Sequence, residues 1–352
     1  MTRLTKKHRV LVAGCGGMSH IWVDYALSRS DTEIVGLVDL SLEAADALAS
    51  RKGLSCPRFT DLREAILQAD ATLVFDVTIP ASHYVIGKTA MEMGCHVFAE
   101  KPLAENLAQC LDLLELSRKS GKIHAVMQNR RFDPNIRALR RLVGGGTIGR
   151  PGFIGADFFI GPHFGGFRDA MDSPLLLDMA IHTFDQARYI LGADPVSVYC
   201  HEFNPPGSWY AGNAMAVCIF EMSDGSVFNY RGSWCAEGAS TSWESSWRIT
   251  GEFGTALWDG QGEPYAEIVA EGGSADRFIR ETKRVAAVPV NMALTGHQAC
   301  LANMFDALET GARPETDCSD NIHSIAMVLG AVESARSGNK VHFAKFMRNG
   351  WA

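Results

Sequence analysis

The sequence predicts an α/β protein in two parts, an N-terminal domain built on a parallel sheet and a C-terminal α/β domain built on a large, open, mostly antiparallel sheet. In residues 10–127, short apolar runs alternate with helical stretches, which is typical of βαβ units. After Gln128, apolar runs with a period of two, broken by glycines, indicate strands with one packed and one exposed face. We therefore place the domains at residues 1–127 and 128–352, with no flexible linker between them.

The elements of the first domain follow in order along the chain. Expected strands cover residues 10–13, 33–39, 71–77, 95–99 and 122–127, and expected helices cover residues 18–29, 42–52, 62–69, 81–93 and 105–120. Ser41 and Asp61 precede two of these helices and are suited to cap them, because their side-chain oxygens accept hydrogen bonds from free backbone amides. Apolar strands such as VLVA and HVFA fit burial on both faces of a parallel sheet.

The second domain begins with helical patterns and continues as strands. We expect a helix over residues 134–143, a strand over 151–160, and a helix that Ser173 and Pro174 open and Gly192 ends. Residues 196–258 contain the period-two runs VSVYCHEF, AMAVCIFEM and SVFNYRGSW. Residues 260–284 give no clear pattern, and helices are expected over 297–308 and 321–337.

The composition limits the classes of partner. The chain has 352 residues, a net charge of -7 and scattered charges, which argue against nucleic acid or an anionic membrane surface as the main partner. No apolar run reaches about 18 residues, so we expect no membrane span. The nine cysteines are odd in number and show no metal-ligand spacing, so we expect neither a disulfide framework nor a bound metal. Free thiols are typical of a reducing compartment, so we also expect a cytoplasmic location.

The stretch LVAGCGGMSH near the start of the chain allows two interpretations. Ala13-Gly14-Cys15 after basic residues resembles a lipoprotein cleavage box, but a signal peptide needs an apolar region of about 7–15 residues. Only residues 10–13 are available here, so we prefer a short buried strand that enters a glycine loop.

The glycine loop has the features of a dinucleotide-binding turn. Gly14 allows a tight turn, Gly16 allows the backbone to approach a pyrophosphate, and Ser19 is small enough for close helix–strand packing. Asp39 ends the second strand, where a carboxylate accepts the ribose hydroxyls of NAD and repels the 2′-phosphate of NADP. The order strand, loop, helix, strand and Asp predicts a Rossmann domain that binds NAD, with NADP possible; the alternative is an ordinary tight turn. The predicted loop contacts are Gly14, Gly16, Gly17 and Met18.

Glu100-Lys101-Pro102 follows the expected strand over residues 95–99. Ligands of open α/β sheets bind at the carboxyl ends of the strands, so this pair is placed to touch cofactor and substrate. The alternative is a solvated loop pair.

Asp178 and His182 lie four residues apart in the stretch SPLLLDMAIHTFDQARYILG, hence on one face of the expected helix. A carboxylate beside a histidine can orient the imidazole and stabilise its protonated form. The alternatives are a helix-surface ion pair or a core histidine. Near the domain junction, the polar segment Gln128-Asn129-Arg130-Arg131-Phe132 can line a cleft or form interface hydrogen bonds.

These motifs, in this order, resemble the Gfo/Idh/MocA oxidoreductase family over essentially the whole chain. The family pattern appears as the Gly14–Ser19 loop, Thr78-Ile79-Pro80 with His83, Glu100-Lys101-Pro102, Asn129 to Pro134, and Asp178 with His182. The resemblance implies a Rossmann domain joined to an open-sheet domain, with a homodimer or homotetramer formed through that sheet.

The resemblance also implies roles for individual residues. Lys101 resembles the lysine that contacts substrate and nicotinamide, His182 the general base and Asp178 its companion carboxylate. The implied cofactor contacts are Asp39, Thr78, Pro80, His83, Glu100, Lys101 and Gln128, and the implied substrate contacts are Lys101, Asn129, Arg130, Arg168, Asp178 and His182.

The chain departs from the family pattern at two places. Phe167 stands where a Trp usually precedes the arginine, and SPLLLDMAIH replaces a glycine-rich approach to the histidine. The expected reaction is hydride transfer between nicotinamide and a sugar, cyclitol or related polyol held between the domains. An NAD-dependent glycosidase and a non-catalytic dinucleotide-binding regulator remain as alternatives.

Overall fold

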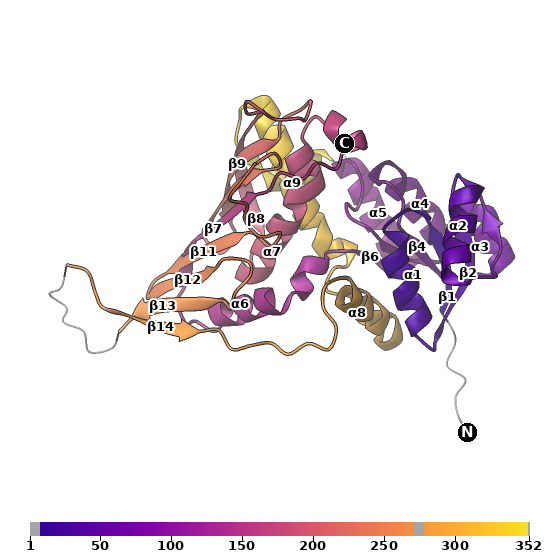
Figure 1. Cartoon of the computed structure of the whole chain (residues 1–352), viewed down its shortest axis with the longest axis horizontal. Helices are drawn as coiled ribbons and strands as arrows, with labels where there is room; N and C mark the ends of the chain where they lie inside the picture. Colours follow the sequence, from indigo (N-terminus) through magenta and orange to yellow (C-terminus); the bar gives the residue numbers. More distant parts are fainter. Residues whose placement is uncertain (1–7, 271–277, 351–352) are drawn as a thin grey trace, which may run out of the picture. The chain divides into compact units, whose positions relative to one another are not determined.

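The computed structural model describes residues 8–270 and 278–350 of the chain. The chain divides into two compact units (Figure 1). Among the described residues, the first unit consists of residues 8–129 and 296–322, and the second of residues 130–295 and 323–350.

The first unit is built on a six-stranded sheet with the order β3-β2-β1-β4-β5-β6, in which all neighbouring strands are parallel. This order confirms the predicted Rossmann fold, and it brings the carboxyl ends of the strands to one edge. The predicted pattern missed only the two-residue strand β3. The strands are β1 (His8–Ala13), β2 (Thr32–Val38), β3 (Arg58–Phe59), β4 (Leu73–Asp76), β5 (His96–Ala99) and β6 (His124–Val126).

Helices cover both faces of this sheet. Helix α1 packs with α2, whereas α3 packs with α4 and α4 packs with α5. Ser41 and Asp61 cap α2 and α3 as predicted, because their side chains accept hydrogen bonds from the amides of Ala44 and Glu64. The helices are α1 (Ser19–Ser28), α2 (Leu42–Lys52), α3 (Leu62–Ala69), α4 (Pro80–Glu92) and α5 (Leu107–Ser120).

Helix α8 (Gly296–Thr310) belongs to the first unit, although it follows most of the second unit in the sequence. It packs against α1, and the Phe305 ring lies 6.0 Å from the Phe75 ring and 5.3 Å from the Phe98 ring between centroids. The predicted division assigned all of residues 128–352 to the second domain, so the structure differs from it over residues 296–322. The physical reason is the aromatic contact of Phe305 with β4 and β5, which no local pattern reveals.

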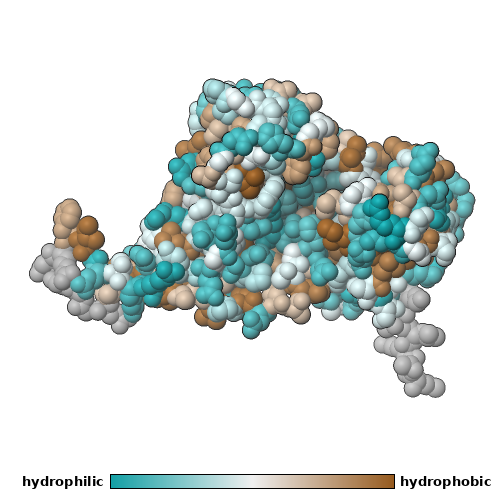
Figure 2. Space-filling model, in the orientation of Figure 1, coloured by the Kyte–Doolittle hydropathy of each residue, from teal (hydrophilic) through white to brown (hydrophobic). Residues whose placement is uncertain are grey.

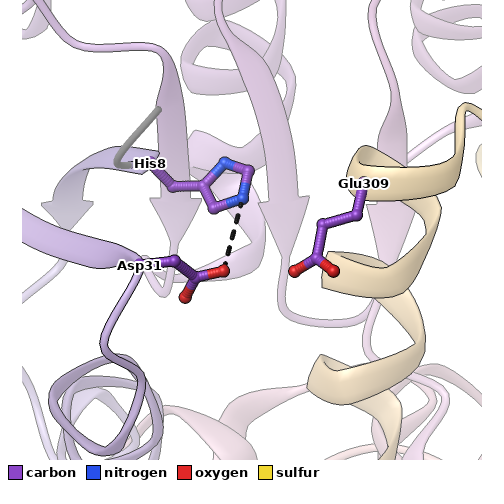
Figure 3. A group of neighbouring side chains, drawn as sticks. All are labelled: His8, Asp31 and Glu309. Carbon is purple, nitrogen blue, oxygen red and sulfur yellow. Dashed lines mark ion pairs between the residues drawn. The ribbon is translucent and has the colours of Figure 1, made fainter. Parts of the chain in front are cut away.

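Ion pairs hold the other end of α8. Figure 3 shows Glu309 of α8 facing Asp31 and His8, three groups whose ligand atoms lie within 4.8 Å of one another. The Arg29 guanidinium bonds to both Asp31 and Glu309. Because one cation already bridges the two carboxylates, we interpret this cluster as a clamp between α8 and the start of β2.

The second unit is built on a nine-stranded sheet with the order β14-β13-β12-β11-β7-β10-β9-β8-β15. Among the described strands of this sheet, β7 and β10 form the one parallel pair and the other neighbours are antiparallel, which confirms a mostly antiparallel sheet. Strands β13 and β14 lie in the region where no clear sequence pattern is found. The strands are β7 (Pro151–Phe159), β8 (Pro195–Phe203), β9 (Met215–Met222), β10 (Val227–Ser233), β11 (Ser246–Gly251), β12 (Gly254–Trp258), β13 (Tyr265–Val269), β14 (Thr282–Ala286) and β15 (Val341–His342).

Helices pack on one face of this sheet, and Phe184 of α7 contacts Phe220, Phe228 and Tyr230 edge-on. The predicted continuous α-helix after Ser173 is instead a π-helix followed by α7. The wider turn joins residues five apart, a feature that often marks functional sites. The helical segments are η1 (Asn129–Phe132), α6 (Pro134–Gly144), η2 (Gly166–Ala170), the π-helix η3 (Leu175–Ala180), α7 (Ile181–Leu191), α9 (Cys318–Ser337), which spans the division between the units, and α10 (Phe343–Asn349).

The surface carries polar and apolar residues side by side. On the face that Figure 2 shows, hydrophobic and hydrophilic residues are interspersed. Within residues 8–270 and 278–350, none of the helices has the length and apolar character needed to cross a membrane.

His124 in β6 is an unusual member of the first unit's core. Its side chain is fully buried, and neither ring nitrogen has a hydrogen-bond partner among the described residues. Burial, and to a smaller extent the nearby His83, lowers the pKa of His124 to about 3. The folded protein therefore holds this imidazole neutral at pH values where the unfolded chain protonates it.

We expect the free energy of unfolding to fall as the pH drops from 6.5 toward 3, because the unfolded chain then binds a proton that folded His124 rejects. In His124→Leu, the loss of stability between pH 7 and pH 5 should shrink by about 1–2 kcal/mol, measured by urea unfolding. His342→Leu, at an exposed position of β15, is the control and should keep the original pH dependence. An unchanged pH dependence in His124→Leu would contradict this account.

Candidate functional site

The glycine loop lies between β1 and α1 at the carboxyl edge of the parallel sheet. Gly14 has a φ of +89°, and a Cβ there would lie 2.4 Å from the backbone oxygen of Val77, so no other residue fits. At Gly16 and Gly17, by contrast, a Cβ would meet no described atom within 4 Å. Within the described part of the chain, no side chain caps the N-terminus of α1, and Met18 precedes this helix. The loop therefore leaves backbone amides available to an anion.

Asp39 directly follows β2 and fixes the loop. One carboxylate oxygen accepts a hydrogen bond from the Cys15 amide at 2.8 Å, and the other accepts one from the Ser41 amide at 2.9 Å. The Cys15 thiol is buried, and burial, with the negative charge of Asp39, raises its pKa to about 12. Cys15 is therefore a packed, protonated side chain, while Asp39 keeps a partly exposed carboxylate beside the loop.

The segment after β4 is tied to its neighbours. The Thr78 hydroxyl donates to Asp76 at 2.6 Å, and Pro80 begins α4. Both ring nitrogens of His83 lie at backbone oxygens, 2.6 Å from Pro102 and 3.1 Å from Thr78. His83 therefore joins the Thr78 segment to the loop after β5. The sequence missed Asp76, whose fully buried carboxylate has one oxygen with no hydrogen-bond partner in the described part of the chain.

Glu100 and Lys101 follow β5 at the same edge. Glu100 is buried, and its carboxylate accepts a hydrogen bond from the Trp22 indole of α1 at 2.9 Å. The Glu100 amide also donates a hydrogen bond to the backbone oxygen of Asp76 in β4, at 2.8 Å. These two contacts fix the backbone that carries Lys101, whose side chain is partly exposed.

The polar segment after β6 completes the first unit's share of the site. Gln128 is 1% exposed, and none of the described residues hydrogen-bonds its amide group. The Asn129 amide lies 3.3 Å from the His297 ring of α8. The sequence could not identify His297, because it lies 168 positions along the chain from Asn129.

These features fit a dinucleotide. The structure combines a helix N-terminus without a side-chain cap, open space at Gly16 and Gly17, a carboxylate that directly follows β2, and the buried Gln128 side-chain amide, which has no hydrogen-bond partner among the described residues. The helix N-terminus favours an anion such as a pyrophosphate, and the carboxylate after β2 favours the hydroxyls of a ribose. The predicted cofactor residues from Gly14 to Gln128 thus all belong to one edge of the first unit.

Asp178 and His182 lie in the second unit, on the π-helix η3 and the first turn of α7. Asp178 accepts a hydrogen bond from the Arg168 Nε at 2.8 Å, and its side chain is 12% exposed. His182 is 8% exposed. Arg168, which the resemblance placed among the substrate contacts, is thus an ionic partner of Asp178.

Arg130 and Arg131 take different roles. Arg131 forms a buried ion pair with Asp185 at 2.6 Å. We interpret this pair as structural, because both side chains are shielded from solvent. Arg130 lies 3.7 Å from the Glu244 carboxylate and 3.9 Å from the Met179 sulfur, and it bonds to the backbone of Trp243. Burial lowers the pKa of the Arg130 guanidinium.

Ser173 does not cap a helix as predicted. Its hydroxyl donates to Glu202 of β8 at 2.9 Å, and burial raises the pKa of Glu202 to about 7. Nothing in the sequence around Glu202 indicates a buried carboxylate, because β8 alternates between polar and apolar residues.

Two family models match this chain, one in its N-terminal part and one in its C-terminal part. Residues 8–128 match the family described as "Oxidoreductase family, NAD-binding Rossmann fold", and residues 136–257 match the "GFO/IDH/MocA C-terminal domain". The "Uncharacterized protein y4oX" of Sinorhizobium fredii is 30% identical over 97% of each chain. The D-glucoside 3-dehydrogenase of Escherichia coli is 32% identical over 57% of this chain and 59% of that protein.

The fold is shared with solved structures. An oxidoreductase from Agrobacterium radiobacter, solved in complex with NAD+, L-tartaric acid and magnesium, has a TM-score of 0.84 and 19% identity, covering 97% of this chain and 99% of that one. With both domains matched and a relative aligned over nearly its whole length, the chain belongs to the Gfo/Idh/MocA family of NAD-binding oxidoreductases.

Proposed function

We propose that the protein transfers a hydride between nicotinamide and the CH–OH carbon of a sugar, cyclitol or related polyol. The observation that carries this proposal is the position of Lys101, two residues after the end of β5, at the sheet edge that also holds the glycine loop and Asp39. The D-glucoside 3-dehydrogenase relative supports a sugar substrate. Asp178 and His182 supply the acid–base pair that a CH–OH reaction needs.

When bound, NAD supplies the hydride acceptor. In the oxidation direction we assign His182 as the base that takes the hydroxyl proton, while the hydride leaves the same carbon. Lys101 holds positive charge near the developing alkoxide, and such charge is effective where water is excluded. Asp178 orients the imidazole and favours its protonated form, and Arg168 fixes Asp178 in turn.

The remaining predicted residues hold or position ligands. We assign Gly14, Gly16, Gly17, Met18, Thr78, Pro80, Glu100 and Gln128 to the cofactor, and Asn129 and Arg130 to the substrate side. His83 acts through the two loops that it joins. We also propose NAD over NADP, because Asp39 repels a 2′-phosphate and the exposed Leu40 that follows offers it no cation.

His182→Ala and Lys101→Ala should each lower kcat by about 10²–10⁴-fold, because each removes a group that stabilises the moving charge. Turnover is measured as NADH absorbance with a panel of polyols and sugars. NAD binding, measured by thermal shift, should persist in both variants, since neither change alters the glycine loop.

Lys122→Ala and His342→Ala are matched controls outside the assigned site and should retain turnover. Near-normal turnover in both site variants would exclude the assigned roles. Glycoside cleavage without net NADH would favour the glycosidase alternative instead.

Asp39→Asn should narrow the preference for NAD over NADP by about tenfold, which corresponds to about 1.4 kcal/mol. Asparagine keeps a side-chain acceptor beside the Cys15 amide but removes the charge that repels the 2′-phosphate. The dissociation constants of both cofactors, from calorimetry, test this. Asp61→Asn, a cap of α3, is the control and should leave the ratio unchanged.

We propose that the exposed face of the nine-stranded sheet joins copies of the chain. Along β9, buried residues alternate with Val217 and Ile219, which are 37% and 45% exposed. Tyr199 of β8 pairs with Ile219 and is 45% exposed. Apolar side chains gathered on an open sheet face favour association.

Ile219→Asp should shift the wild-type dimer or tetramer to monomer, because the new charge would be buried without a partner. Light scattering after size exclusion gives the mass. Glu221→Asp on the same strand serves as the control. A monomeric wild-type protein at micromolar concentration would contradict the proposal.

A further inference from the structure

Three aromatic side chains of the second unit stand out because they are exposed and yet firmly supported. Phe164, Phe167 and Trp243 are 56%, 57% and 45% exposed. We call them the aromatic wall. Trp243 packs edge-on against the buried Trp234 at 5.6 Å, and Phe164 contacts both indoles at 6.0 and 6.4 Å. Exposed aromatic rings on a rigid base are typical of binding sites.

Two arginines tie this wall to the helical turn that carries Asp178. Arg168 lies over the rings of Phe164 and Phe167 at 5.2 and 4.7 Å, and its Nε bonds to Asp178. On the other side, Arg130 bonds to the Trp243 backbone and approaches the sulfur of Met179, the neighbour of Asp178. The wall is thus held at the acid–base pair by two independent contacts.

The wall lies beside the reacting position and does not replace it. The Arg168 side chain separates the phenylalanine rings from the Asp178 carboxylate. When the hydroxyl of one substrate ring reaches Asp178 and His182, the aromatic faces of the wall therefore stay available to a neighbouring part of the same substrate molecule.

The chemistry of the wall favours a neutral sugar ring. The C–H bonds on one face of a pyranose carry partial positive charge, and they pack on the negative face of an aromatic ring. Arg168 is engaged by Asp178 and by two rings, and Arg130 by Glu244, so the wall does not favour a phosphate or carboxylate.

We propose that the substrate carries a second sugar ring, and that Phe164, Phe167 and Trp243 bind this ring while the first ring reacts. This inference rests on the proposed sugar dehydrogenase function and narrows its substrate class to disaccharides and larger glycosides. The three side chains determine specificity and do not take part in the hydride transfer.

Matched pairs of sugars test the proposal: glucose with cellobiose and maltose, and galactose with lactose. For at least one pair, kcat/KM should be tenfold or more higher for the disaccharide. In Phe164→Leu and Trp243→Leu this ratio should fall by roughly two- to tenfold each, the effect of one aromatic contact. Phe164→Tyr keeps the ring and should restore the ratio.

Phe253→Leu is the control, because Phe253 is 60% exposed but lies between β11 and β12. Equal kcat/KM for both members of every pair, or a ratio unmoved by the wall variants, would overturn the proposal. Calorimetric binding of the disaccharides to the Lys101→Ala protein provides a readout without turnover. Binding there that depends on Phe164, with no NADH from any sugar in the wild type, would retain the wall and reject the dehydrogenase function.

Discussion

The close approach of two backbones at Gly14 is the constraint on which the first unit depends. Because Gly14 has no side chain, the loop after β1 can lie against the backbone that follows β4. That contact sets where α1 begins and therefore where Trp22 points. The Trp22 indole bonds to Glu100, and Glu100 fixes the backbone of Lys101. The absence of a Cβ at Gly14 thus permits the contacts that link the glycine loop to Lys101, the residue proposed to stabilise the alkoxide.

The second unit reaches its functional geometry through charge pairs. Arg168 bonds to Asp178, Arg130 lies beside Glu244, and Arg131 forms a buried ion pair with Asp185. Two of these arginines also contact the segment η3, where the π-helical turn replaces a regular one. Arg168 holds this wider turn at Asp178 and Arg130 approaches it at Met179. The same contacts hold the aromatic wall, so the residues proposed for specificity and the proposed acid–base pair share one framework.

Local patterns were sufficient to predict most of the first unit. Apolar runs located its main strands, and Ser41 and Asp61 located the starts of two helices, because these signals depend only on neighbouring residues. The motif residues Gly14, Asp39 and Glu100 also lie at one sheet edge, since parallel strands bring their ends together.

The features that the sequence did not reveal depend on contacts between distant segments. Phe305 joins α8 to the first unit, Glu202 becomes buried through its neighbours, and His297 meets Asn129 across 168 positions. The π-helix similarly stands where the flanking residues predicted a regular helix, and Ser173 bonds to Glu202 in β8 and does not cap it. None of these contacts leaves a periodic signal in the chain.

The placement of α8 has a consequence for how the protein forms. The chain passes from the first unit to the second after residue 129, returns at residue 296, and leaves again after residue 322. During synthesis the rings of Phe75 and Phe98 therefore lack their contact with Phe305 until more than two hundred further residues have been made. Such distant pairing raises the contact order and slows folding. A fragment cut at the end of β6 would lack this cover, so the first unit cannot be obtained whole by expressing the N-terminal part of the chain alone.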